Sequence, residues 1–166
     1  MQKLLILGAG QYGMVTRETA EATGAFEMIS FLDDHNPLAI GPLDAYHSFA
    51  QSYDSAVVAI GNPTLRLQWL EKLAHAGFQI PILIHPKAYV SPSARLEGGT
   101  LVEPMAVVQA GAVVERGGLL CAGSVVNHNS FLAEGCHVDC NAVVPANSRV
   151  PAGTKVPCGS VFQNQS

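Results

Sequence analysis

The C-terminal half of the chain repeats every six residues, and this period constrains the fold more than any other feature. No α-helix has a period of six, and a meandering sheet would not keep one this long without insertions. One large apolar residue occupies the same place in every repeat. This column of fourteen consists of Ile84, Val90, Leu96, Val102, Val108, Val114, Leu120, Val126, Leu132, Val138, Val144, Val150, Val156 and Phe162.

Two further columns keep the same register. Four residues after each large residue, up to Val156, comes a small one such as Ala, Ser, Thr, Gly or Cys. Three residues after it, ten of thirteen positions are Gly or Asn. A tight corner needs positive φ, at which a Cβ costs about 1–2 kcal/mol, and Gly and Asn tolerate it best. The three columns predict a parallel β-helix with the large residues inside.

Residues 1–82 follow a different rhythm, in which predicted strands alternate with helices. Buried strands are expected at "KLLILG", "EMISFLDD", "SAVVAIG" and "FQIPILI". Helices are expected at "YGMVTRETAEATG" and "TLRLQWLEKLAHAG". Such alternation indicates a small parallel sheet of the nucleotide-binding kind. We therefore expect an α/β Rossmann-like domain at residues 1–82 and an all-β coil at residues 83–166.

Composition excludes several classes of function. The net charge of −4 offers no basic surface for nucleic acid. No apolar run approaches the roughly 20 residues of a membrane span. The N-terminus "MQKLLILGAG" does not have the pattern of a signal peptide, because its apolar part is short and Gly-X-Gly follows. We expect a cytoplasmic protein whose four cysteines are reduced.

A glycine-rich loop, "GAGQYG", follows the first predicted strand and precedes a helix. Its glycines are Gly8, Gly10 and Gly13, and Asp33 ends the second strand. Backbone N–H groups at a helix N-terminus suit a diphosphate, and an acid at this place suits a ribose hydroxyl. A nicotinamide cofactor is disfavoured because no second mononucleotide-binding half follows. A loop that merely closes a tight turn remains the alternative.

In order along the chain, "LLILGAGQYG", "FLDD", "AIGNPTLR", "LIHPKAYVSPSARLEGGTLVEPMAVV" and "SVVNHNS" resemble the bacterial sugar acetyltransferases. The resemblance is to the sialic acid O-acetyltransferase type, which includes enzymes that N-acetylate UDP-linked 4-amino sugars. It implies a left-handed β-helix in which three hexapeptides make one triangular turn. It also implies acetyl transfer from acetyl-CoA to an amine or hydroxyl of a nucleotide-linked sugar. The implied assembly is a homotrimer with its active site between neighbouring coils.

The resemblance assigns roles to individual residues. His128 matches the histidine that serves as general base, and a neutral imidazole suits that role because its ordinary pKa lies near cellular pH. His137 matches a second histidine near the acyl donor, where it could stabilise the oxyanion. His137 and Ala146 are thus expected to contact acetyl-CoA. The residues expected to line the nucleotide-sugar site are Gly10, Gly13, Asp33, Asp34, Gly61, Asn62 and Arg66.

The chain departs from the family pattern in three places. Gln11-Tyr12 replaces the usual Gly-His pair of the loop, and Asn129 stands where the family has an acid beside the base. The coil is also short after His137, which leaves less wall for CoA. The first departure indicates different substrate contacts, and the other two support an alternative, a non-catalytic nucleotide-sugar-binding or scaffold trimer.

A metal site is not expected from this stretch. The zinc set Cys136, His137 and Cys140 lacks a fourth ligand, and Cys136 belongs to the inward column of small residues. Cys140 and Cys158 lie 18 residues apart and should stack on successive turns. We expect them to form a ladder of thiols on one corner.

Overall fold

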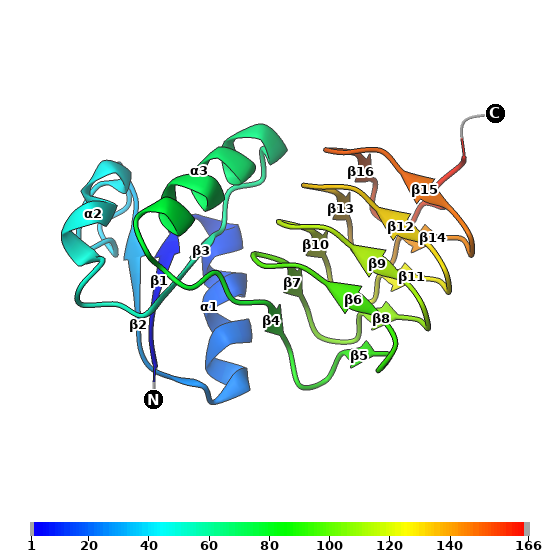
Figure 1. The fold of residues 1–166 in the computed structure, drawn as a ribbon, viewed down its shortest axis with the longest axis horizontal. Coiled ribbons are helices and arrows are strands. Elements are labelled where there is room, and N and C mark those ends of the chain that lie inside the picture. Colours follow the sequence, from blue (N-terminus) through cyan, green and yellow to red (C-terminus); the bar gives the residue numbers. More distant parts are fainter. Residues whose placement is uncertain (1, 165–166) are drawn as a thin grey trace. The chain divides into compact units, whose positions relative to one another are not determined.

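The computed structural model describes residues 2–164 and divides the chain into two compact units, Met1–Pro81 and Ile82–Ser166. Figure 1 shows three strands with helices around them in the first unit, and a stack of short strands in the second. The division falls one residue before the expected boundary. Each unit is described by itself.

The first unit contains a parallel sheet with strand order β2-β1-β3. The strands are β1 (Gln2–Leu7), β2 (Phe26–Leu32) and β3 (Ser55–Val58). The helices are α1 (Gln11–Thr23), a 3₁₀ turn η1 (Leu43–Ala45), α2 (Tyr46–Phe49) and α3 (Pro63–His75). This architecture is the predicted Rossmann-like one.

The fourth strand predicted in this unit, "FQIPILI", is wrong. Only a single bridge joins Gln79 to Ser55, and Leu83 and Ile84 pair with the coil instead. Pro81 interrupts the segment, and a proline cannot donate the N–H that a ladder position requires.

The core of the first unit explains its continuous apolar strand. Leu4, Leu5, Ile6 and Leu7 of β1 are all fully buried. A parallel sheet covered on both faces needs apolar residues at every position of its central strand, because successive side chains point to opposite faces. Leu5 and Leu7 share a core with residues of α3, whereas α1 lies against β1 and β2.

The second unit is a left-handed parallel β-helix, as predicted. Its strands have two residues each, and each pairs in parallel with the strand 18 residues further on, as Leu119 does with His137. Three such sheets form the three faces of the coil. The first face consists of β4 (Leu83–Ile84), β7 (Leu101–Val102), β10 (Leu119–Leu120), β13 (His137–Val138) and β16 (Lys155–Val156). The second consists of β5 (Tyr89–Val90), β8 (Val107–Val108), β11 (Val125–Val126) and β14 (Val143–Val144). The third consists of β6 (Arg95–Leu96), β9 (Val113–Val114), β12 (Phe131–Leu132) and β15 (Arg149–Val150).

The column of large residues lies inside the coil and the column of Gly and Asn lies at its corners, as the repeat predicted. From Val102 to Val156 every member of the large column is at most 2% exposed and belongs to one core. All ten Gly and Asn corner residues have positive φ, including Asn129 at 54°. Met105, which lies in the same column without being Gly or Asn, adopts positive φ as well. The other positions of the repeat therefore carry the side chains that lie outside the coil.

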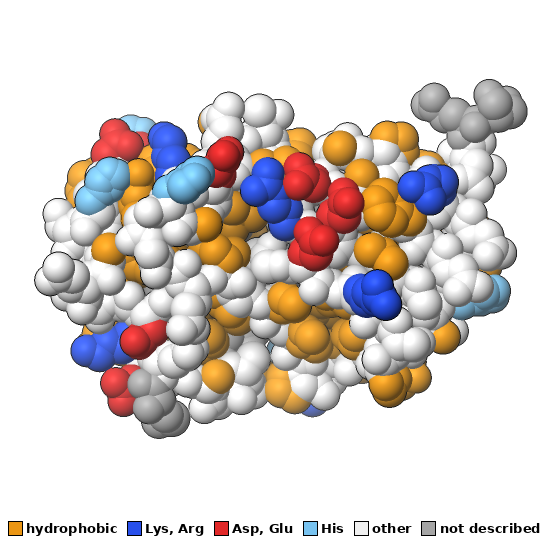
Figure 2. All heavy atoms as spheres, viewed as in Figure 1, with side chains coloured by type: hydrophobic (Ala, Val, Ile, Leu, Met, Phe, Trp, Pro, Cys, Tyr) orange, Lys and Arg blue, Asp and Glu red, His pale blue; other side chains and the backbone are white. Residues whose placement is uncertain are grey.

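Charged and apolar side chains are mixed on the surface. Figure 2 shows acidic and basic side chains interspersed with hydrophobic ones on the face in view, without a continuous basic band. Among residues 2–164, no helix is long and apolar enough to cross a membrane.

Candidate functional site

The loops that carry the expected nucleotide-site residues meet at one edge of the sheet. They follow the carboxyl ends of β1, β2 and β3, which are neighbours in the parallel sheet. The N–H of Gly8 donates to the carbonyl of Leu32, and the N–H of Ala59 donates to that of Leu7. Ligands of open parallel sheets bind at such an edge.

The glycines at this edge of the sheet differ in how much space a Cβ would find at each of them. A Cβ on Gly13 would overlap the carbonyl oxygen of Gly8, so Gly13 allows the helix to pack closely on the loop. A Cβ on Gly10 or Gly61 would meet nothing within 4 Å. Gly10 is the N-cap of α1 and has no side chain to occupy the space before the helix. Open backbone at a helix N-terminus is suited to a phosphate.

Asp33 holds the glycine loop in place. Its Oδ2 accepts the N–H of Ala9 at 2.8 Å, and its Oδ1 accepts the N–H groups of His35 and Asn36 at 2.9 and 3.0 Å. The hydrogen bond from Ala9 is the largest cause of a lowered pKa for Asp33. Its neighbour Asp34 accepts the N–H of Leu43 at 2.9 Å. Both carboxylates thus shape loops, and their contact with a ligand stays a prediction.

Asn62 and Arg66 organise the loop after β3. Asn62 caps α3, and its Oδ1 accepts the N–H of Leu65 at 3.0 Å. Arg66 is fully buried, and its Nη1 donates to the carbonyls of Ile60 and Gly61 at 2.9 and 3.0 Å. The guanidinium therefore lies behind the loop rather than at its surface. Arg66 was expected to line the nucleotide site, but its buried side chain instead holds the carbonyl of Gly61.

His128 is exposed at the corner between β11 and β12, as predicted. Its Nδ1 donates to Oδ1 of Asn127 at 2.9 Å, and its backbone N–H donates to the same oxygen at 2.8 Å. At the same corner on the turns before and after His128 lie Ala110 and Ala146, 18 residues away in each direction. Their small side chains leave the imidazole uncovered. With Nδ1 bonded, Nε2 is the nitrogen available to accept a proton.

Asn129 does not orient this histidine. It occupies the left-handed corner, its N–H donates to the carbonyl of Ala110 at 3.0 Å, and its Oδ1 lies against Gly111. Asn127 performs the orienting role instead, and the sequence analysis missed it. The signal was present in "VVNHNS", where an amide precedes the histidine as well as following it.

His137 lies on β13 in a mixed environment of sulfur and charge. Its Nε2 is 3.2 Å from Sγ of Cys121 and 4.0 Å from Oδ1 of Asp139. Asp139 also pairs with Nζ of Lys155 at 3.0 Å. Burial raises the pKa of Asp139, but the hydrogen bonds from Lys155 and from the N–H of Cys140 outweigh it, and the pKa is lowered. His137 thus has an anion nearby that could stabilise a positive imidazole.

The structure does not bring the two histidines together within one chain. His128 lies at the corner that joins the second and third faces, whereas His137 lies on the first face. In a triangular coil that corner is opposite that face. A site that uses both imidazoles therefore needs two copies of the chain.

A cavity of about 390 Å³ lies beside the expected donor-binding residue Ala146, which is half-buried. It is lined by Asn147, Arg149, Pro151, Thr154, Phe162 and Asn164. Cζ of Arg149 lies 4.6 Å from the centre of the Phe131 ring, so the guanidinium is held over an aromatic face. The cavity offers one cation and several polar groups to a ligand.

Comparison with known proteins agrees with this arrangement of loop and coil. The family described as the PglD N-terminal domain matches residues 3–73. The acetyltransferase domain of PglB from Neisseria gonorrhoeae FA1090, solved with acetyl coenzyme A, is 35% identical with a TM-score of 0.94. That match covers 99% of this chain and 83% of the other. The chain belongs to the bacterial sugar acetyltransferase family.

Two further proteins are similar to this chain. A UDP-N-acetylbacillosamine N-acetyltransferase of Bacillus subtilis (strain 168) is 29% identical over 111 residues, or 61% of this chain. The chain spans about half of that relative, with 51% of it covered. A variant of perosamine N-acetyltransferase from Caulobacter crescentus, in complex with CoA and GDP-perosamine, shares the fold at 24% identity and a TM-score of 0.78. That match covers 99% of this chain and 90% of the other.

Proposed function

We propose that this sugar acetyltransferase moves an acetyl group from acetyl-CoA to the amine of a nucleotide-linked amino sugar. The observation that carries the proposal is the exposed His128 imidazole, whose Nδ1 is bonded to Asn127 and whose Nε2 is therefore the nitrogen available to accept a proton. The PglB domain that this chain resembles holds acetyl coenzyme A, and the Bacillus relative is named for N-acetylation of a UDP-sugar. The first supports acetyl-CoA as the donor, and the second supports an amine acceptor over a hydroxyl.

The reaction needs one proton to be removed as a C–N bond forms. The acceptor amine attacks the thioester carbonyl, and Nε2 of His128 takes the amine proton. The C–S bond then breaks to release the CoA thiolate, which takes that proton from the imidazolium and leaves as the thiol. Asn127 keeps the proton on Nδ1, so the ring enters the reaction with the correct nitrogen free. The imidazolium that forms then has the amide oxygen of Asn127 as its partner.

His137 is proposed to act at the other end of the reacting bond. Its ring lies on the first face, where it could donate a hydrogen bond to the oxygen of the tetrahedral intermediate. Because that face is opposite the corner of His128, the two roles come from neighbouring copies of the chain. The proposed assembly is therefore a homotrimer with three shared sites, as in the family.

The remaining parts of the substrates have plausible places on the two units. The open backbone of Gly10 and Gly61 is proposed to receive the nucleotide diphosphate, in a loop held by Asp33 and Arg66. The cavity beside Ala146, with Arg149 in its wall, is proposed to receive part of CoA. Because both substrates are cytoplasmic metabolites, the proposed location is the cytoplasm.

Release of the CoA thiol tests the proposal directly. The purified chain is incubated with acetyl-CoA and a panel of UDP- and GDP-linked amino sugars, and free thiol is measured with a chromogenic disulfide. We expect turnover with at least one amino sugar and none with His128→Ala. An exposed side chain can be removed without loss of the fold, and circular dichroism checks this. Binding of nucleotide-sugar without any thiol release would instead support the non-catalytic scaffold.

A further inference from the structure

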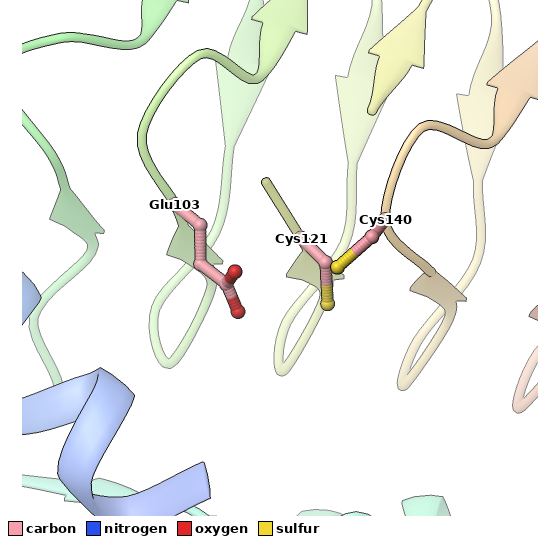
Figure 3. Close-up of side chains that lie close together, drawn as sticks. All are labelled: Glu103, Cys121 and Cys140. Carbon is pink, nitrogen blue, oxygen red and sulfur yellow. The ribbon is translucent and has the colours of Figure 1, made fainter. Parts of the chain in front are cut away.

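A cluster of sulfur and oxygen atoms lies at the corner after the first face of the coil, and the proposed reaction does not use it. Glu103 follows β7, Cys121 follows β10, and Cys140 comes from the next turn. One carboxylate oxygen and the two Sγ atoms all lie within 4.8 Å of one another. Figure 3 shows the three side chains converging from successive turns.

Glu103 is a buried carboxylate without a cation. It is 6% exposed, and its Oε2 accepts the N–H of Ala122 at 2.9 Å. Within residues 2–164, no Lys or Arg forms an ion pair with it. Burial raises the pKa of Glu103, because an anion loses its hydration there. The Cys121 thiol also hydrogen-bonds this carboxylate, and a cation bound between the two would favour its ionised form.

The two thiols indicate which class of cation the cluster would bind. Burial raises the pKa of both Cys121 and Cys140, and nearby Glu103 adds to the effect. A raised pKa does not suit the role of a reactive nucleophile. A metal ion reverses this by displacing the thiol protons. Two thiolates and a carboxylate form a ligand set that zinc accepts, with bond lengths near 2.3 and 2.1 Å.

We propose that Glu103, Cys121 and Cys140 bind a thiophilic divalent cation of the zinc class, with a fourth position open to water. Tetrahedral bonds of the usual length place ligand atoms roughly 3.3–3.8 Å apart. Donors within 4.8 Å of one another reach this spacing through small side-chain rotations. The carboxylate is already oriented by the N–H of Ala122, as ligands usually are by outer-shell groups.

This ligand set differs from the one rejected on sequence grounds. Cys136 is fully buried in the coil interior, and its Sγ donates to the carbonyl of Pro151 at 3.1 Å. Cys121 was overlooked because it lies in neither the small column nor the corner column. The 18-residue spacing of Glu103 and Cys121, one full turn of the coil, was the signal available.

Binding of the cation would also affect the proposed reaction. Sγ of Cys121 is 3.2 Å from Nε2 of His137, so a metal on that sulfur places positive charge beside the histidine. We expect zinc to inhibit turnover and a chelator to restore it. This consequence rests on the proposed function, whereas the binding itself does not.

Cobalt titration of the reduced, full-length protein tests the site without reference to activity. Cobalt bound by thiolates gives a near-ultraviolet charge-transfer band that grows with the number of Co–S bonds. We expect one cobalt per chain and a two-thiolate band that zinc abolishes by displacement. No band, or a stoichiometry well below one, would overturn the proposal.

Three variants assign the ligands. Cys140→Ser should reduce the band to about half and weaken binding by about 100-fold or more, since loss of an outer-shell partner alone costs 10–100-fold. Glu103→Gln should weaken binding without halving the band. Cys158→Ser is the matched control, because this exposed cysteine lies outside the cluster. A band that keeps its full intensity in Cys140→Ser, or is reduced in Cys158→Ser, refutes the assignment.

Discussion

Hybrid trimers offer the sharpest test of where the two histidines act. His128 lies at the corner between the second and third faces of the coil, opposite the first face that carries His137. If both serve one reaction, each active site takes His128 from one subunit and His137 from its neighbour. A His128→Ala trimer and a His137→Ala trimer are then both impaired, but a mixture of their subunits contains some intact sites.

The size of the recovered activity follows from the geometry. In equal random mixtures, half of the subunits keep His128 and half keep His137. A shared site is intact only when both contributing subunits are of the right kind, which gives about a quarter of wild-type activity. Sites contained within a single chain would recover nothing, because every chain carries one of the two substitutions.

The assay uses co-expression of the two variants with different affinity tags, followed by purification through both tags. Purification through both tags removes the trimers that contain only one of the two variants. The expected activity of the remaining hybrid trimers is therefore slightly above a quarter of wild-type activity. Thiol release by the hybrids is compared with that of separately purified variants mixed afterwards. Hybrid activity no greater than the post-purification mixture would refute the shared site.

Three further predictions concern single residues. Asn127→Ala should lower kcat about 5–30-fold, from loss of a hydrogen bond worth about 1–2 kcal/mol to the developing imidazolium, and steady-state kinetics measure the change. Leu132→Ala should lower the free energy of unfolding by about 2–5 kcal/mol in denaturant titrations, because Leu132 is fully buried in the coil core. Asp33→Asn should destabilise the protein at neutral pH, whereas Asp44→Asn at an exposed site should not. The pKa of Asp33 is lowered in the folded state, so its stabilisation is present above the unfolded value near 3.9 and lost as pH falls through the folded one. A difference between Asp33→Asn and wild type that persists unchanged at pH 3 would contradict this reasoning.

The coil could be predicted from sequence almost residue by residue because its period leaves no freedom of register. A shift of one residue would expose the large column, from Val102 to Val156, and bury the corner residues. The first unit was predicted less completely. Its segment around Gln79 has the composition of a strand, but Pro81 limits its pairing to one bridge. Whether such a segment becomes a strand depends on partners far along the chain, which its local sequence does not show.

The positions of the two histidines outside the coil could be predicted, whereas their surroundings could not. His128 and His137 could be found because the repeat register left both of them outside the coil. Their neighbours could not be found in the same way, because Cys121 and Asn127 are recognised only through contacts one turn away or through a side-chain orientation. Arg66 was assigned to the ligand site from its place in a family motif, whereas its side chain is fully buried.

The replacement of an acid by Asn129 changes meaning once the corner is described. At φ 54° its backbone serves the turn, and its side chain faces Gly111, so an acid at this position would not point at the Nδ1 of His128 without rotation of its side chain. Orientation of the imidazole already comes from Asn127 on the other side. What an amide cannot supply is negative charge for the imidazolium. The deficit is therefore electrostatic rather than geometric, and Asn127→Asp, which adds that charge at the residue already in contact, should raise turnover more than Asn129→Asp. Equal or greater activity of Asn129→Asp would show that the corner side chain reaches the histidine after all.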